Sequence, residues 1–207
     1  MYTPPAFAQD DLATIHGMIR ATGLATLVTM TDEGLIGTPL PLILKEDEGP
    51  CGTLYGHLAR PNSQWKLEPR AEALVIFPGP DAYISPSWYA AKAEHGKVVP
   101  TWNYSAVHAY GTPEFFEDPD RLLGIVSALT DRNEASRSAP WAISDAPDDY
   151  IRARLRGIVG LRLAISRLEG KQKFSQDKPE ADRAGVAKGL AEEADPSARE
   201  MAGLIPR

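Results

Sequence analysis

The chain has 207 residues, of which 43% are hydrophobic and 24% are charged, and its formal net charge is −6. This composition is ordinary for a globular protein and excludes a wholly disordered chain. No apolar run approaches the roughly 18 residues of a membrane span, and the N-terminal residues lack the features of a secretory signal. Cys51 is the only cysteine, which excludes an internal disulfide and a multi-cysteine zinc site. We therefore expect a cytoplasmic protein.

The charge distribution argues against direct DNA binding. DNA-binding domains usually carry a basic balance, because phosphate contacts release counterions and supply much of the affinity. Only residues 151–173 are basic here, with a single acidic residue, Glu169, among them. A solvated face or a phosphate site explains this stretch better than DNA contact does.

The first half of the chain predicts a helix followed by short strands with many turns, as in a barrel or sandwich. Apolar residues at helical spacing predict a helix that Asp10 caps and Gly23 ends. A buried strand is expected at 24–29 and an extended segment at 35–44. Pro39 and Pro41 place that segment at a sheet edge or bulge, because proline cannot donate a ladder hydrogen bond.

Further strands are expected along the middle of the chain. The pattern predicts strands at 53–58 and 72–77, the second ended by the Pro-Gly-Pro sequence at 78–80. Another strand is expected at 82–89, interrupted at Pro86. Residues 98–111 are long enough for one bent strand or two.

Helices become more frequent after Pro113. Asp118 and Pro119 predict a helix start, and Pro147 predicts another. The apolar face of the first of these helices is expected to hold Leu122, Leu123, Val126 and Leu129. Alternation predicts a half-exposed strand at 158–168, and one or two surface helices are expected after Pro179.

The histidines and the cysteine give no sign of a metal or thiol site. His16, His57, His95 and His108 share no metal-binding spacing, so no metal site is expected. Cys51 lies in a turn without an adjacent basic residue, which favours an inert thiol.

Three segments combine polar, basic and aromatic residues. They lie at 56–66, at 85–89 together with 94–104, and at 171–177. A segment of this composition, taken alone, more often belongs to the core or to a turn than to a binding site. Together they supply an aromatic-lined cleft, amide hydrogen bonds and a cationic phosphate pocket. A planar cofactor that carries a phosphate would need all three.

The chain resembles the PaiB-like family of FMN-binding negative transcriptional regulators over nearly its whole length. The resembling strings are MYTPPAFAQDD, GHLARPN, AYISPSWY, AEHGKVVPTWNY with VHAYG, APWAISDAPDDYI and RLEGKQKFSQDKPEADRAGV. The resemblance implies an α+β fold, mainly an antiparallel split β-barrel with peripheral helices, similar to pyridoxamine-phosphate oxidase and the flavin reductases. It also implies a homodimer with FMN at the subunit interface. We expect one domain over 1–207, with a helical C-terminal extension from about residue 178.

The resemblance implies three groups of cofactor-binding residues. The turn that would face the FMN phosphate contributes His57, Arg60, Asn62, Gln64 and Trp65. The strand that would flank the cofactor contributes Lys97, Thr101, Trp102 and Asn103. The C-terminal motif contributes Lys173, Ser175 and Gln176, which could reach the partner subunit's flavin.

One position departs from the family pattern. The C-terminal motif of the family reads Lys-x-Ser-Gln-Asn, and Asp177 stands here in place of the Asn. A carboxylate repels a phosphate, so Asp177 is not expected to touch that end of FMN.

Three functions are compatible with these features. The first is an FMN-binding negative transcriptional regulator that acts indirectly or through a flavin-linked activity. The alternative is a flavin-dependent oxidoreductase of the flavin reductase or pyridoxamine-phosphate oxidase class, and the third is a cofactor-free binding module of the same fold. No acid or base for a defined substrate stands out, so no catalytic residue is assigned and enzymatic activity stays open.

Overall fold

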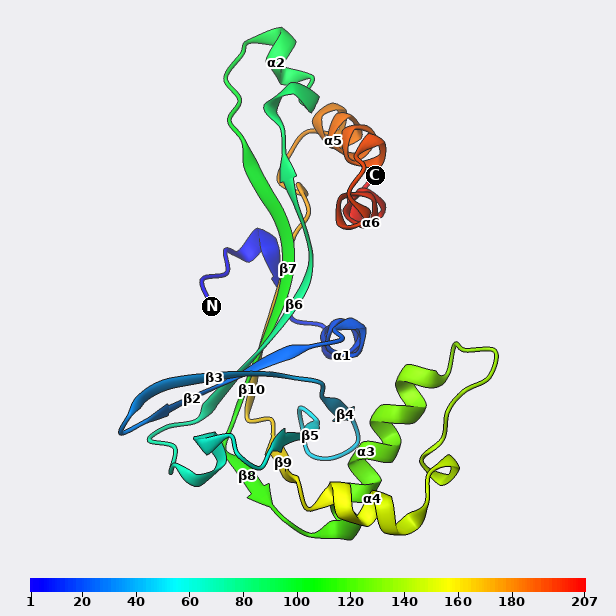
Figure 1. The fold of residues 1–207 in the computed structure, drawn as a ribbon. Coiled ribbons are helices and arrows are strands. Elements are labelled where there is room, and N and C mark those ends of the chain that lie inside the picture. The colour runs from blue at the N-terminus through cyan, green and yellow to red at the C-terminus, as the bar shows by residue number, and fades with distance from the viewer. The chain divides into compact units, whose positions relative to one another are not determined.

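The computed structural model describes residues 1–207 and combines helices with two antiparallel sheets (Figure 1). The chain forms two compact units. Unit 1 comprises Met1–Met18, Pro78–Val107 and Glu169–Arg207, and unit 2 comprises Ile19–Phe77 and His108–Leu168. The first sheet has the strand order β1-β10-β7-β6-β2-β3 and the second has the order β4-β5-β9-β8. Three strands of the first sheet, β6 (Ala73–Ile84), β7 (Thr101–Gly111) and β10 (Arg167–Lys173), each belong partly to both units.

Unit 2 contains the hairpin of β2 (Ala25–Thr31) and β3 (Gly34–Leu40), which pair from Ala25 with Leu40 to Thr31 with Gly34. As predicted from its prolines, β3 is an edge strand. The second sheet of this unit consists of β4 (Ile43–Lys45), β5 (Thr53–Ala59), β8 (Pro113–Phe116) and β9 (Ile158–Ala164).

Two helices pack on the second sheet. Helix α3 (Pro119–Glu134) contacts β5 and β9, and α4 (Asp148–Leu155) contacts α3 and β9. Asp118 caps α3 as predicted, because its side chain accepts a hydrogen bond from the Arg121 N–H. The buried face of α3 differs from the prediction: Ile125 is buried, whereas Leu123 is 36% exposed.

Unit 1 contains β1 (Ala8–Gln9), paired with β10, and helices α2 (Ala91–Glu94), α5 (Glu180–Glu192) and α6 (Pro196–Leu204). Figure 1 shows α5 and α6 beside the end of the β6–β7 hairpin. The two helices were expected at the surface, but each has a buried face. Val186, Leu190 and Met201 from these faces form a core with Ile84 and Phe174.

Three local predictions were wrong. Helix α1 (Leu12–Ala21) is capped by Asp11, whose Oδ2 accepts from the Thr14 N–H at 2.8 Å, and not by Asp10. The strand expected to end before Pro78 instead runs through to Ile84. A single strand was expected at 158–168, with a turn-like polar segment starting at Lys171. The structure has two strands instead, β9 and β10, and Lys171 lies within β10.

Other predictions were confirmed. The segment 98–111 contains a single strand, β7, which starts at Thr101. The Leu161, Leu163 and Ile165 side chains are all buried, as the alternation predicted. None of the helices has the length and apolar character that crossing a membrane requires.

Candidate functional site

A cavity of about 450 Å³ lies wholly within unit 1. Its walls come from the loop after α2, the start of β7, the end of β10 and the first turn of α5. The size lies within the roughly 300–1,000 Å³ range of small-molecule sites. Five of the predicted cofactor residues line it: Lys97, Thr101, Asn103, Lys173 and Ser175.

Lys173 is held in a fixed position in this cavity. Its Nζ donates to Thr101 Oγ1 at 2.6 Å and to the Trp102 carbonyl oxygen at 2.8 Å. Burial lowers the pKa of Lys173, an effect that the nearby Tyr104 and Asp177 oppose. The ammonium group therefore stands partly desolvated at the cavity wall, where an anion would restore a charged partner.

The other charged groups of the cavity differ in how far they are already paired. Lys178 Nζ lies 3.0 Å from Asp177 Oδ2, so these two charges offset each other. Asp182 is buried, and its Oδ1 accepts from the Ala91 N–H at 3.0 Å. Lys97 lies on the exposed side of the cavity, where its backbone N–H donates to His95 Nδ1.

A buried amide and hydroxyl form the inner wall. Asn103 is completely buried, and its Nδ2 donates to Ser175 Oγ at 2.9 Å. Ser175 has φ +61°, the left-handed region that non-glycine residues rarely adopt. Such a conformation costs on the order of 1–3 kcal/mol and is concentrated at functional sites.

Two predicted residues of unit 1 do not line the cavity. Trp102 is 53% exposed, and its ring meets the Tyr83 ring edge-on at 6.0 Å. Gln176 braces the chain near the end of β10: its Nε2 donates to the Gln172 carbonyl oxygen, and its Oε1 accepts from the Phe174 N–H.

Sequence reasoning missed several lining residues, among them Tyr89, Lys178 and Asp182. Tyr89 is buried, and its hydroxyl has no hydrogen-bond partner. Burial also raises the pKa of Tyr89. Tyr89 is the last residue of AYISPSWY, one of the strings that carry the family resemblance. Its place in that string was the only sequence feature that could have indicated a site residue. Asp182 carried no signal, because it reads as an ordinary first-turn acid.

The predicted turn group lies in unit 2, and its polar residues are engaged within that unit. Gln64 is completely buried, and its Nε2 donates to Thr29 Oγ1 at 3.0 Å and to the Ile36 carbonyl oxygen at 3.1 Å. Asn62 Oδ1 accepts from the Gln64 N–H, which starts the short 3₁₀ helix η2 (Ser63–Lys66). These amides connect the turn to the β2–β3 hairpin.

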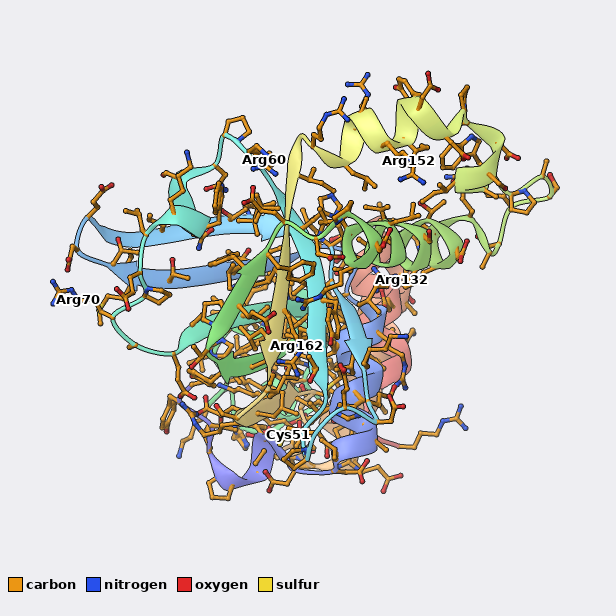
Figure 2. The ribbon with its side chains drawn as sticks, turned by 90° about the horizontal axis from the view of Figure 1, so that it is seen from below. Cys51, Arg60, Arg70, Arg132, Arg152 and Arg162 are labelled. Atoms are coloured by element: carbon orange, nitrogen blue, oxygen red, sulfur yellow. The ribbon has the colours of Figure 1, made fainter.

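Arg60 also forms hydrogen bonds and an ion pair within unit 2. Its Nε donates to the Arg156 carbonyl oxygen at 2.6 Å, its Nη2 donates to the Ile158 carbonyl oxygen, and its Nη1 pairs with Glu117. Trp65 Nε1 donates to the Arg60 carbonyl oxygen at 2.9 Å. Figure 2 labels Arg60 in this turn. This guanidinium therefore has a carboxylate partner within its own unit.

His57 lies on β5, with its Nδ1 buried and without a hydrogen-bond partner. Burial lowers the pKa of His57. The imidazole is therefore neutral near neutral pH and contributes no positive charge for a phosphate.

Comparisons with known proteins agree with the resemblance. A sequence profile of the family described as "Putative FMN-binding domain" matches residues 1–167. A Bacillus subtilis protein named "Protease synthase and sporulation protein PAI 2" is 34% identical over 207 residues, covering 99% of this chain and 96% of that protein. An uncharacterized protein of Emericella nidulans is 32% identical, covering 92% of this chain and 90% of its own.

The chain belongs to this FMN-binding family.

FMN is accordingly the cofactor of this FMN-binding domain protein. The family profile ends at residue 167, so Lys173 and Ser175 lie beyond it. The Bacillus relative, in contrast, matches almost the whole chain, including the segment that completes the unit 1 cavity.

Solved structures show the split-barrel flavin-binding fold. The FAD and heme binding protein from Mycobacterium smegmatis has a TM-score of 0.58 at 18% identity, covering 94% of this chain and 96% of that chain. The flavocytochrome Anf3 from Azotobacter vinelandii has a TM-score of 0.59 at 17% identity, covering 86% and 75% of the two chains. The predicted α+β fold is confirmed.

Proposed function

We propose that this protein binds FMN in the unit 1 cavity and serves as a PaiB-type negative transcriptional regulator that acts through its flavin or a partner. The observation that carries the proposal is the set of cavity charges. Asp177 and Lys178 offset each other. Lys97 and Lys173 outnumber the remaining carboxylate, Asp182, and leave a positive charge for a phosphate.

The cavity also fits the rest of the cofactor. A phosphate monoester carries a charge of about −1.5 to −2 near neutral pH, which favours a site where ammonium groups outnumber carboxylates. The buried Asn103–Ser175 pair provides a rigid polar wall. Bound FMN would supply the redox-active ring, while the chain binds and orients it.

The regulatory part rests on the family resemblance. The name of the Bacillus subtilis relative refers to sporulation, a cellular programme and not a single reaction. A regulator that binds a flavin can respond to the redox state or the supply of that flavin.

The test compares Lys97→Ala with the matched control Lys92→Ala. Lys92 lies on α2, outside the cavity lining, and its Nζ donates to Ser87 Oγ. We expect Lys97→Ala to weaken FMN binding by about tenfold or more and to leave riboflavin binding nearly unchanged, because one charge-assisted phosphate contact is lost. Lys92→Ala should bind both ligands as the wild type does.

Fluorescence titration with FMN and with riboflavin measures both affinities. Equal affinity of the wild type for the two ligands would rule out a phosphate-binding role for the cavity. Absence of any binding would refute the proposed function itself.

A flavin-dependent oxidoreductase is the second candidate. The fold is shared with solved flavin- and heme-binding proteins, which favours redox chemistry as much as regulation. Anaerobic addition of NADH or NADPH to the FMN-loaded protein distinguishes the two, since rapid bleaching of the flavin bands indicates an oxidoreductase.

We also propose a homodimer with FMN at the subunit interface. The edge position of β3 and the exposed Tyr83–Trp102 pair leave surface that a second copy can cover. Light scattering should give twice the chain mass of 22.5 kDa, and a mass near 22.5 kDa at micromolar concentration would contradict the dimer.

A further inference from the structure

A second cavity, of about 530 Å³, lies wholly within unit 2 and shares no lining residue with the flavin cavity. Ile43, Phe116, Ile125 and Ala128 make its apolar wall, on β4, β8 and α3. Its polar rim contains groups of both charges, and two of them are held in place. Neither the family resemblance nor the proposed function assigns a role to this cavity.

Gly124 keeps part of this cavity open. It lies in the interior of α3 and lines the cavity, and a Cβ built on it would meet no atom within 4 Å. Glycine in a helix interior costs about 1 kcal/mol relative to alanine. Packing does not require the glycine here, so its effect is to leave space at the apolar wall.

Two carboxylates, Asp47 and Glu48, line the rim, and Glu48 is the one held in place by a hydrogen bond. Tyr55 OH donates to Glu48 Oε1 at 2.9 Å, and Arg162 Nε donates to Tyr55 OH at 3.1 Å. Figure 2 labels Arg162 on β9. Burial and the Glu48 hydrogen bond raise the pKa of Tyr55, so its hydroxyl stays protonated and continues to hold the carboxylate.

Two cationic side chains, Lys45 and Arg121, line the rim, and Arg121 is the one held in place by its neighbours. Its Cζ lies 3.6 Å from the centroid of the Phe116 ring, and its Nη2 donates to Glu114 Oε1 at 3.0 Å. A guanidinium has five N–H donors, so this one bond leaves others available to a ligand. Stacking on the ring fixes the plane in which those donors lie.

We propose that this cavity binds a zwitterion with an apolar body, namely an apolar amino acid or a short peptide of such residues. The ligand's ammonium group meets Glu48, its carboxylate meets Arg121, and its apolar side chain packs against Ile125 in the space beside Gly124. Binding is non-covalent and needs no flavin. A regulatory protein would gain a site that senses amino-acid or peptide supply.

Calorimetric titration of the wild type with L-phenylalanine and with the dipeptide Phe-Phe tests the ligand class and distinguishes the two sources. Phenethylamine lacks the carboxylate and 3-phenylpropionate lacks the ammonium group. We expect each to bind about tenfold or more weakly than the zwitterion, because one charge-assisted contact is lost. Analogues that bind as tightly as the zwitterions, or the absence of any heat with both zwitterions, would overturn the proposal.

Gly124→Leu tests the location, since leucine is a strong helix former and fills the open space. Gly203→Leu is the matched control, because Gly203 is also helical and has no atom within 4 Å of its built Cβ. We expect Gly124→Leu to lose zwitterion binding by more than about tenfold while keeping wild-type FMN affinity, and Gly203→Leu to keep both. Wild-type zwitterion affinity in Gly124→Leu would overturn the assignment of the site.

Discussion

Arg60 illustrates how a residue that resembles a phosphate ligand can have a structural task. It supplies two hydrogen bonds to backbone carbonyl oxygens and pairs with Glu117. We expect Arg60→Ala to lower the free energy of unfolding by about 1–2 kcal/mol, because those acceptors lose their donor. The preference for FMN over riboflavin should remain.

Urea denaturation and flavin titration of the same protein measure the two effects. Lys66→Ala is the control, because both cations lie over the Trp65 ring. Arg60 Cζ is 5.9 Å and Lys66 Nζ is 5.3 Å from the ring centroid. If Arg60→Ala keeps full stability but loses the preference for FMN, the turn and not the unit 1 cavity holds the phosphate.

His57 gives a prediction for pH dependence. Burial lowers the pKa of His57 in the folded state, below the unfolded value of about 6.5. As the pH falls below about 6.5, the unfolded chain takes up a proton that the folded chain resists. The stability contributed by the neutral imidazole is therefore present above that pH and is lost as the pH falls through the folded pKa.

The measurement is the urea midpoint at about pH 8 and about pH 5.5. The decrease in the urea midpoint from the higher to the lower pH should be smaller in His57→Gln than in the wild type. His95→Gln changes an exposed histidine and should behave as the wild type. An unchanged pH dependence in His57→Gln would show that other groups cause it.

The sequence grouped the strand residues that line the unit 1 cavity better than the other lining residues. Thr101 and Asn103 were expected on one face because side chains alternate along a strand, and both line the cavity. Tyr89 and Asp182 come from segments far apart in the chain. Their approach depends on tertiary packing, which local patterns do not contain.

Among the elements, β6 shows why strand ends are hard to predict. The sequence Pro78-Gly79-Pro80 is a strong turn signal, yet the strand continues through it to Ile84. A Cβ built on Gly79 would overlap Ser105 Oγ on β7. The glycine thus permits close approach of two strands, a role that glycine in a strand can have and that composition alone does not distinguish from a turn.

Helix α5 provides a test of a second close approach. A Cβ on Gly185 would overlap the Trp88 carbonyl oxygen, whereas one on Gly203 in α6 would meet no atom. Alanine gains about 1 kcal/mol over glycine in a helix, so Gly203→Ala should be neutral or stabilising. Gly185→Ala should lower stability by about 1–3 kcal/mol, because overpacking outweighs that gain.

Thermal or urea unfolding of the two variants provides the comparison. Equal stabilisation by both substitutions would show that α5 has room to shift away from Trp88.

For the fold as a whole, periodicity and turn residues predicted most elements and the family resemblance implied the fold class, but neither indicated the division into two compact units. The unit boundaries fall within α1, β6, β7 and β10 and not in a polar linker. Continuous strands carry no change in composition at such a boundary, so the sequence shows no sign of it. The single-domain organisation stays a prediction.

The basic residues of 151–173 lie on α4, β9 and β10, except Arg156, which follows the last residue of α4. In unit 2, Arg162 binds Tyr55 OH, Arg154 stacks on Tyr150 and Arg167 stacks on Tyr110. Figure 2 labels Arg152 on α4 and Arg162 on β9. Several of these cations are therefore engaged in contacts within the chain.

We accordingly expect no useful sequence-specific binding of duplex DNA by the isolated protein. The net charge of −6 produces a repulsive long-range field toward DNA, and the engaged arginines form no row of free donors for base edges. Fluorescence anisotropy with promoter and scrambled duplexes across a salt series measures the preference. Specific binders prefer their site by about 10³-fold or more, so a preference above about a hundredfold at physiological salt would contradict this expectation. Salt-dependent binding that is equal for both duplexes would reflect phosphate contacts alone and would leave regulation to the flavin or a partner.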